Sequence, residues 1–274
     1  MAGRDRKKQL ARQRYERQVA RQAAQRQRAR RMKIIGSVVA VVLVVGASAG
    51  LATVIGGDSE PKGDAAAAAP TDQPTTPAPQ PSVSVKPGEC AYLPNSEQGA
   101  KDVGTPAKKP AYKGAAQATL KTSLGEIVVD LDGGKAPCTV SSLAFLAKKN
   151  FFDDTKCHRL TTEGIKVLQC GDPTGSGAGG PAYRFANENT KGAKYDRGTL
   201  AMAHSAQPDS NGSQFFIVYG DSPLPADYTV FGKVVKGLDV VDEVAKAGSD
   251  DAAGQGDGAP KKQITIQDVA VAKK

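Results

Sequence analysis

The sequence predicts a mainly β fold over about residues 116–274, a barrel or sandwich of short strands capped by two helices. Short segments with alternating apolar residues recur through this region, and only two segments have helical spacing. Strands and helices do not alternate as they do around a parallel sheet. The length of 274 residues would allow two domains, but only the part after about residue 115 is apolar enough to bury a core. We therefore expect one folded domain.

The N-terminal segment 1–33 carries most of the positive charge. It holds 13 Lys or Arg and two acidic residues, a local net charge of +11, whereas the whole chain has a formal net charge of +9. The other 241 residues are close to neutral, at −2, which argues against a basic nucleic-acid-binding fold in that part. We interpret 1–33 as a basic cytoplasmic tail. The alternative is a tail that binds anionic lipid or RNA.

An uncharged apolar segment, 34–55, follows the tail and predicts a transmembrane helix, because about 20 apolar residues span a bilayer core. Basic residues precede it and acidic residues follow it, so the positive-inside rule predicts a cytoplasmic N-terminus and an exported remainder. A cleaved signal peptide is the alternative, since Ala47-Ser48-Ala49 resembles a cleavage site. The long charged region and the long apolar run favour an uncleaved signal-anchor in the cell membrane.

Residues 56–115 form an Ala- and Pro-rich segment that predicts a disordered linker. Ten of the 17 prolines lie between residues 58 and 112, and such a composition cannot bury enough apolar surface to fold. A flexible chain of this length spans roughly 40–45 Å. Cys90 and Tyr92 suggest that the end of the linker packs against the domain.

The domain begins with a predicted β-hairpin over 118–131, in which Ile127, Val129 and Leu131 share one face. Pro137 is expected to open a helix that Asn150 can cap, and residues 237–247 predict a second helix. Further strands are expected at 156–161, 166–170, 198–203, 213–219, 229–235 and 263–272.

Several sequence patterns predict no chemistry. Gly175, Gly177 and Gly180 satisfy G-x-G-x-x-G, but no strand leads into it and no helix follows, so a structural loop is expected. The two histidines and the absence of a Cys-x-x-Cys pair argue against zinc, and no cofactor is expected. Cys157 and His158 are adjacent on a strand and would point to opposite faces.

Four cysteines lie on the predicted exported side, at positions 90, 138, 157 and 170. An oxidising compartment favours one or two disulfides, and full pairing allows three connectivities. The sequence leaves these connectivities open, together with the alternative of free buried thiols.

Two stretches carry the chemistry, 157–181 and 198–219. The first places Arg159 and Gln169 on adjacent strands, and the second holds Met202-Ala203 and the run Asn211-Gly-Ser-Gln-Phe-Phe216. A guanidinium with amides and aromatic surface, and no acid–base pair, predicts a groove for an amide-rich ligand, meaning a peptide.

These stretches resemble the cyclophilin family of peptidyl-prolyl cis–trans isomerases over about residues 118–272. The resemblance covers the segment that begins SLGEIVVDL, then LQCGDPTGSGAGGP, NGSQFFI and YTVFGKVVKGLDVVDEV, in the family's order. It implies a closed eight-stranded antiparallel β-barrel capped by two α-helices. The complete layout is similar to membrane-attached cyclophilins of actinobacteria.

The resemblance also implies roles for individual residues. Arg159 matches the catalytic arginine. The peptide-binding positions match Gln169, Val167, Met202, Ala203, His204, Gln214, Phe216, Leu224 and Tyr228.

Three departures from the family pattern stand out. Two extra residues separate Arg159 from Gln169, and Lys166 and Val167 stand where the family has aromatic and Met side chains. A register shift could place Ile165 in the apolar wall instead. Pro223 stands where cyclosporin-sensitive members carry Trp, so cyclosporin binding is expected to be weak.

The resemblance implies a cofactor-free enzyme that isomerises X–Pro bonds in exported proteins, outside the membrane. Its partners would be proline-containing polypeptides and, through the N-terminal helix, the membrane; no nucleic acid is expected for the folded domain. Lys166 leaves open a binding module that grips proline segments with little turnover. A structural cell-envelope protein with a vestigial groove is the third reading.

Overall fold

The computed structural model describes residues 86–274. The predicted basic tail at 1–33, the predicted transmembrane helix at 34–55 and the first part of the predicted linker, 56–85, lie outside the described residues. Between residues 86 and 274, no helix has the length and apolar content needed to cross a membrane.

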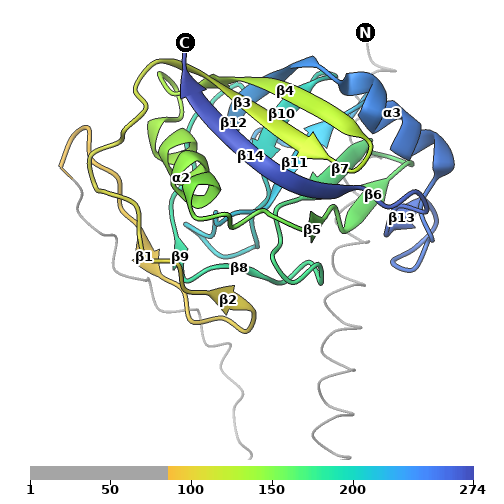
Figure 1. Cartoon of the computed structure of the whole chain (residues 1–274), viewed down its shortest axis with the longest axis horizontal. Helices are drawn as coiled ribbons and strands as arrows, with labels where there is room; N and C mark the ends of the chain where they lie inside the picture. The colour runs from red at the N-terminus through yellow and green to blue at the C-terminus, as the bar shows by residue number, and fades with distance from the viewer. Residues whose placement is uncertain (1–85) are drawn as a thin grey trace, which may run out of the picture. The chain divides into compact units, whose positions relative to one another are not determined.

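The described chain is mainly β with two helices, as expected (Figure 1). The helices are α2 (Pro137–Lys148) and α3 (Leu238–Ala247). The strands are β1 (Leu93–Pro94), β2 (Ala100–Lys101), β3 (Ala115–Thr122), β4 (Gly125–Asp132), β5 (Thr155–Lys156), β6 (Arg159–Thr161), β7 (Val167–Cys170), β8 (Gly180–Pro181), β9 (Tyr183–Arg184), β10 (Thr199–Met202), β11 (Phe215–Val218), β12 (Val230–Lys236), β13 (Asp257–Gly258) and β14 (Thr265–Lys273).

The β3–β4 hairpin follows the predicted alternation. Ile127, Val129 and Leu131 are buried, and the residues between them are half-buried. The Thr122 hydroxyl donates to the Gly125 carbonyl across the turn and accepts from the Leu124 N–H. The hairpin is therefore set by local pattern and turn chemistry together.

One curled sheet holds ten strands in the order β13-β6-β7-β11-β10-β12-β4-β3-β14-β5. The prediction of a closed eight-stranded barrel is wrong, because this hydrogen-bonded order has two end strands, β13 and β5, and the sheet is a half-barrel. The predicted strand 156–161 is interrupted: the Cys157 N–H donates to Ile264 beside β14, and the His158 N–H donates to Gln169 on β7. The chain thus changes partners within two residues, which splits the strand into β5 and β6.

The helices lie at opposite ends of the long strands β3, β4 and β14 (Figure 1). Pro137 opens α2, and Glu188 accepts hydrogen bonds from the Cys138 and Thr139 N–H groups that would otherwise lack a partner at its N-terminus. Before α3, Gly237 has φ +84°, and a Cβ there would lie 2.1 Å from the Glu126 carbonyl oxygen. Only glycine fits this approach of β4 to the helix.

Residues 86–113 form a strap on the outside of the domain. Cys90 is bonded to Cys138 at the start of α2, and the Tyr92 hydroxyl donates to the Cys138 carbonyl. Strand β1 pairs with β9, and β2 pairs with β8. The packing expected from Cys90 and Tyr92 therefore extends along the strap.

The second disulfide joins Cys157 to Cys170, so both cysteine pairs are bonded. Cys157 and Cys170 are buried in the main core beneath β6 and β7. Of the connectivities left open by the sequence, the structure shows 90–138 with 157–170.

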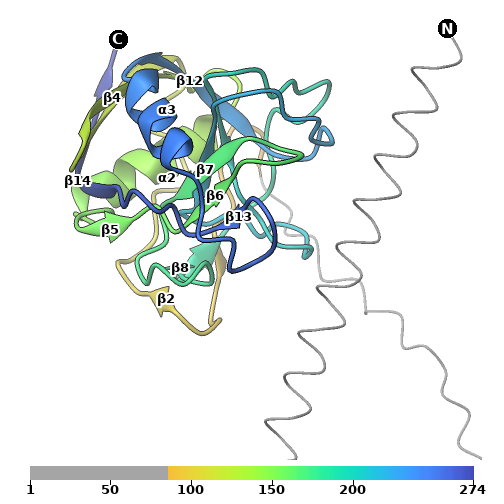
Figure 2. The ribbon, with the colours of Figure 1, turned by 90° about the vertical axis from the view of Figure 1, so that its right-hand side faces the viewer.

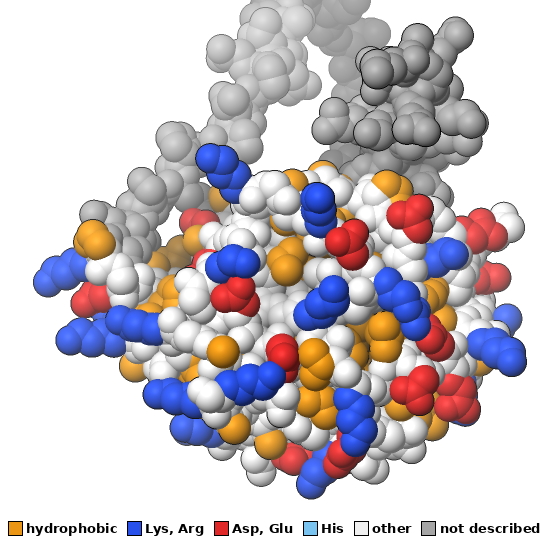
Figure 3. All heavy atoms as spheres, turned by 90° about the horizontal axis from the view of Figure 1, so that it is seen from above, with side chains coloured by type: hydrophobic (Ala, Val, Ile, Leu, Met, Phe, Trp, Pro, Cys, Tyr) orange, Lys and Arg blue, Asp and Glu red, His pale blue; other side chains and the backbone are white. Residues whose placement is uncertain are grey.

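Charge is mixed over the face seen in Figure 3, where basic and acidic side chains are interspersed. This agrees with the near-neutral composition of the chain outside its N-terminal tail.

Candidate functional site

A pocket of about 130 Å³ lies on the outer face of the sheet, over β6, β7 and β11. It brings together eight of the ten predicted site residues. Its lining consists of Arg159, Ile165, Val167, Gln169, Ala203, His204, Phe216, Leu224 and Tyr228.

Strand alternation explains why these side chains meet. On β7, Val167 and Gln169 face the pocket while Leu168 and Cys170 enter the main core. On β11, Phe216 faces the pocket between core residues Phe215 and Ile217. Gln169 lies opposite Arg159 in one strand pair and opposite Phe216 in the other, so three neighbouring strands present their side chains side by side.

One side of the pocket, the polar wall, is a chain of hydrogen-bonded side chains: Asp257, Arg159, Gln169 and Gln214. Arg159 donates Nε–H and Nη2–H to the two Asp257 oxygens, at 2.7 and 2.8 Å. Its Nη1 lies 3.4 Å from Gln169 Oε1, and Gln169 Nε2 donates to Gln214 Oε1 at 2.8 Å. Gln214 Nε2 in turn donates to the carbonyls of Gly177 and Gly179. Each side chain in the wall is therefore oriented by the next.

The rest of the lining includes an aromatic group, here called the apolar floor. Phe216 meets Tyr228 edge-on with ring centroids 5.4 Å apart, and Tyr195 packs against both rings. His204 lies over Tyr228 with centroids 4.7 Å apart, and its nitrogens contact the carbonyls of Ser205 and Asp227. The floor offers a rigid apolar surface of the kind that binds a small ring.

Lys166 does not enter the pocket. Its side chain is exposed and lies along Gly220, where an added Cβ would come within 2.6 Å of Lys166 Cδ. Ile165 lines the pocket instead. The turn between β6 and β7 thus accommodates the two extra residues. An apolar side chain, Ile165, lines the pocket at this point in place of a lysine.

Two predicted residues stand elsewhere. Met202 is buried in the main core and does not line the pocket, because it and Ala203 are adjacent and point to opposite sides. Gln214 belongs to the polar wall and reaches the pocket through Gln169. Asp257 was missed by the sequence analysis altogether.

The glycine-rich segment 175–180 is a structural loop, as expected. It folds over Asp172, a fully buried carboxylate that accepts from Thr174 and from the Gly177 N–H. Burial raises the pKa of Asp172, but hydrogen bonds from Thr174, Gly179 and Gly177 outweigh it and hold the pKa below 3.8. The loop supplies the two carbonyls that fix Gln214, so it supports the polar wall.

His158 lies under this loop. Its two ring nitrogens are buried without a hydrogen-bond partner among the residues the structure describes, and Gly177 stands over the ring. Burial lowers its pKa below 6.5, with Asp172 acting in the opposite direction and Arg159 in the same one. Burial therefore favours the neutral form of the His158 imidazole.

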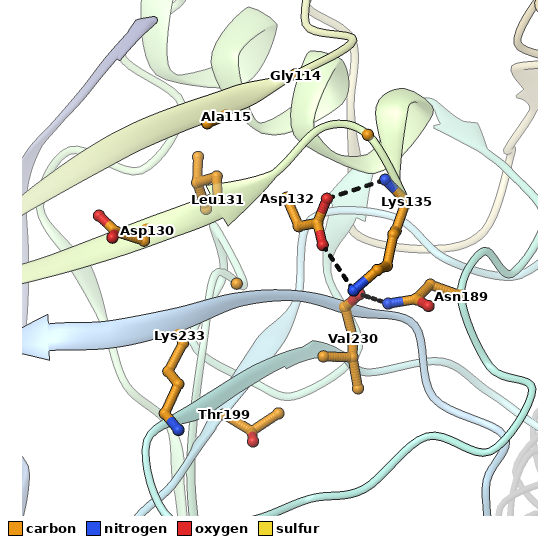
Figure 4. Close-up of a pocket in the computed structure, with 12 residues that line it drawn as sticks. Gly114, Ala115, Asp130, Leu131, Asp132, Lys135, Asn189, Thr199, Val230 and Lys233 are labelled. Carbon is orange, nitrogen blue, oxygen red and sulfur yellow. Dashed lines mark hydrogen bonds and ion pairs between the residues drawn. The ribbon is translucent and has the colours of Figure 1, made fainter. Parts of the chain in front are cut away.

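A second hollow, of about 350 Å³, lies beside β4, β10 and β12 (Figure 4). Several of its polar groups are already engaged: Lys135 pairs with Asp132, Asn189 donates to the Val230 carbonyl, and Asp130 pairs with Lys274. It lacks the aromatic surface of the first pocket. Within 86–274, no three His, Cys, Asp or Glu side chains are grouped as metal ligands would be.

Comparison with known proteins gives one consistent family. The family model described as cyclophilin type peptidyl-prolyl cis-trans isomerase matches residues 117–271. The probable peptidyl-prolyl cis-trans isomerase B of Mycobacterium leprae is 46% identical over 194 residues, which cover 65% of this chain and 65% of the relative. The protein of the same name from Mycobacterium tuberculosis is 44% identical over 196 residues, 66% of this chain and 63% of the relative. The matched part of the chain thus spans just under two thirds of these relatives.

Solved structures match as well, among them two of one protein. A cyclophilin type peptidyl-prolyl cis-trans isomerase from Cryptosporidium parvum has a TM-score of 0.51 and 29% identity, over 58% of this chain and 99% of that one. A crystal structure of the same protein in the presence of the dipeptide Ala-Pro matches with a TM-score of 0.51, 30% identity and the same coverage.

Proposed function

Because the chain belongs to the cyclophilin-type peptidyl-prolyl cis-trans isomerase family, we propose that it accelerates the cis–trans isomerisation of X–Pro bonds in proline-containing polypeptides. The observation that carries this proposal is the pocket itself, whose lining combines the Arg159 guanidinium with the apolar floor. A proline ring on the floor would place its amide beside a fixed cationic donor.

The isomerisation requires only rotation about the X–Pro amide bond. The barrier of about 18–20 kcal/mol arises from amide resonance, and no bond between heavy atoms has to break. An acceleration of about 10⁵ corresponds to about 7 kcal/mol. A nucleophile, a metal and a cofactor are therefore not needed for this step.

In the proposed mechanism, Phe216, Leu224 and Tyr228 hold the proline ring, and the backbone at Ala203 and His204 holds the preceding residue. Arg159 donates hydrogen bonds to the prolyl carbonyl and towards the prolyl nitrogen as that nitrogen becomes pyramidal. These bonds favour the twisted state, in which the nitrogen lone pair has left resonance, over the planar ground state. Arg suits this role because it stays charged and presents its donors in a fixed plane.

The decisive test is Arg159→Ala in an isomerisation assay with an Ala-Pro peptide. We expect kcat/KM to fall about 10²–10³-fold, as when a preorganised transition-state donor is removed. Arg197→Ala is the matched control, because Arg197 is also a half-exposed arginine paired through two bonds with an aspartate, Asp242. Equal activity of the two variants would remove Arg159 from the mechanism.

The alternative of a binding module without turnover loses the feature that favoured it. That reading rested on Lys166 in the apolar wall, and Lys166 lies outside the pocket.

We further propose that the domain works outside the cell membrane on exported proteins, tethered by a helix at 34–55 with the basic tail in the cytoplasm. The uncharged segment with basic residues before it supports this, and so do two disulfides, which persist in oxidising compartments. Fractionation of cells that express the full chain, with protease added from outside, tests the anchor and the side on which the domain lies.

A further inference from the structure

The polar wall begins at Asp257, a residue of a short strand 98 positions after Arg159 in the chain. Strand β13 pairs with β6, with Gly258 opposite Leu160 and Asp257 opposite Thr161. This pairing places the carboxylate beside the guanidinium (Figure 2, where β13 lies alongside β6). The side chain of Asp257 is 20% exposed and that of Arg159 40%, so the pair lies at the rim of the pocket.

The two bonds fix the plane of the guanidinium. Asp257 accepts the single Nε–H and one Nη2–H, which is the parallel fork that arginine forms with a carboxylate. The Nη1 edge is thereby turned towards Gln169 and the pocket. An arginine on a flexible side chain would otherwise sample several orientations, and ordering it during the reaction would raise the barrier.

The loop that carries Asp257 is built to hold one conformation. Asp250 Oδ1 accepts from the N–H groups of Ala252 and Ala259, and Asp251 Oδ1 accepts from the Gly256 N–H and the Ser249 hydroxyl. A Cβ on Gly258 would lie 2.0 Å from Asp250 Oδ1. The position of the carboxylate is therefore set by the loop and not only by its attraction to Arg159.

We propose that Asp257 is a positioning residue, which clamps Arg159 so that the Nη1 edge of its guanidinium faces a bound X–Pro bond. The inference rests on the proposed isomerase function. Asp257 touches no substrate in this scheme and acts only through Arg159. Its removal should therefore lower kcat and leave KM nearly unchanged, because the apolar floor that binds the proline ring stays intact.

The experiment compares Asp257→Asn with Asp242→Asn in the full chain. Each variant removes the charge from one aspartate of a two-bonded Arg–Asp pair, but Asp242 faces Arg197 away from the pocket. We expect Asp257→Asn to lower kcat about tenfold or more with KM within twofold, since small displacements of a catalytic group cost rates of this order. Asp242→Asn should stay within twofold of wild type, and Asp257→Glu should recover part of the loss.

A second variant moves the clamp without touching a carboxylate. Gly258→Ala displaces the loop at β13 and should show the same fall in kcat. Wild-type kcat in both Asp257→Asn and Gly258→Ala would overturn the proposal, and so would a loss that appears only in KM.

A spectroscopic readout keeps the clamp testable apart from turnover. The Nε–H resonance of Arg159, assigned by its loss in Arg159→Lys, should exchange slowly with water in wild type and quickly in Asp257→Asn. Fast exchange in wild type would overturn the clamp, even if the variants fail to fold. If the wild-type chain shows no isomerase activity, the proposed function fails while this signal still decides the clamp.

Discussion

The two sides of the pocket are built in different ways. The polar wall joins Asp257, Arg159, Gln169 and Gln214, side chains up to 98 residues apart, through hydrogen bonds that leave each one oriented by the next. The apolar floor is held by ring contacts among Phe216, Tyr228 and Tyr195. Hydrogen bonds specify direction and ring packing supplies contact area. We therefore expect the wall to govern turnover and the floor to govern binding.

Apart from Arg159→Ala, the largest effect that tests this comparison comes from the floor. Phe216→Ala removes a buried ring, and we expect KM to rise about tenfold or more, with kcat less affected, because about 1.5–3 kcal/mol of apolar contact is lost. Isomerisation rates at several peptide concentrations separate the two parameters.

Phe215→Leu is the control, since Phe215 is the neighbour on the same strand that faces the main core. It should lower the melting temperature and leave KM unchanged. A fall in kcat alone for Phe216→Ala would show that the floor also directs the chemistry.

A smaller effect concerns cyclosporin. Pro223 is exposed at the edge of the floor, next to Leu224, and offers no indole N–H. We expect weak binding, and we expect Pro223→Trp to strengthen it by about fivefold or more, the order of one neutral hydrogen bond. Isothermal titration of both proteins measures this, and nanomolar affinity of the wild type would contradict it.

The smallest effect lies behind the wall, at His158. Its pKa is lowered by burial, so the unfolded chain binds more protons than the folded one between the folded pKa and 6.5. The contribution of neutral His158 to the free energy of unfolding should therefore be fully present above pH 6.5 and decline as the pH drops below it. The Asp172 carboxylate raises the pKa of His158 and so makes this fall smaller, whereas Arg159 lowers that pKa and makes the fall larger.

His158→Gln should flatten this pH dependence, because the amide does not titrate. Urea midpoints at pH 7.5 and pH 5.5 test it, with His204→Gln as the variant that leaves the buried imidazole in place. An unchanged slope in His158→Gln would assign the acid sensitivity to other groups.

The sequence predicted most of both sides of the pocket. Arg159, Gln169 and Phe216 were matched through the family resemblance, and strand alternation explains why Gln169 and Phe216 share a face. The same rule could have excluded Met202, whose neighbour Ala203 faces the pocket.

Asp257 could not be found this way. It lies in a run of Asp, Gly and Ala that is typical of a surface turn, and its role depends on the long-range pairing of β13 with β6. The placement of Ile165 in the pocket instead of Lys166 depends on how the turn before β7 absorbs two extra residues. The prediction of a closed barrel was wrong for a related reason. The backbone changes its hydrogen-bond partner from Ile264 at Cys157 to Gln169 at His158, and no local sequence pattern indicates this change.

The bond between Cys90 and Cys138 decides how the domain bears a mechanical load. Tension entering from the N-terminal side of residue 86 reaches Cys90 first and crosses covalently to the start of α2, bypassing the 47 residues between the two cysteines. Strand β3 and the β3–β4 hairpin lie within that bypassed stretch, so a pull from this side cannot unzip them from the sheet. Under reducing conditions the same pull would be transmitted along the strap to β3 and peel it away.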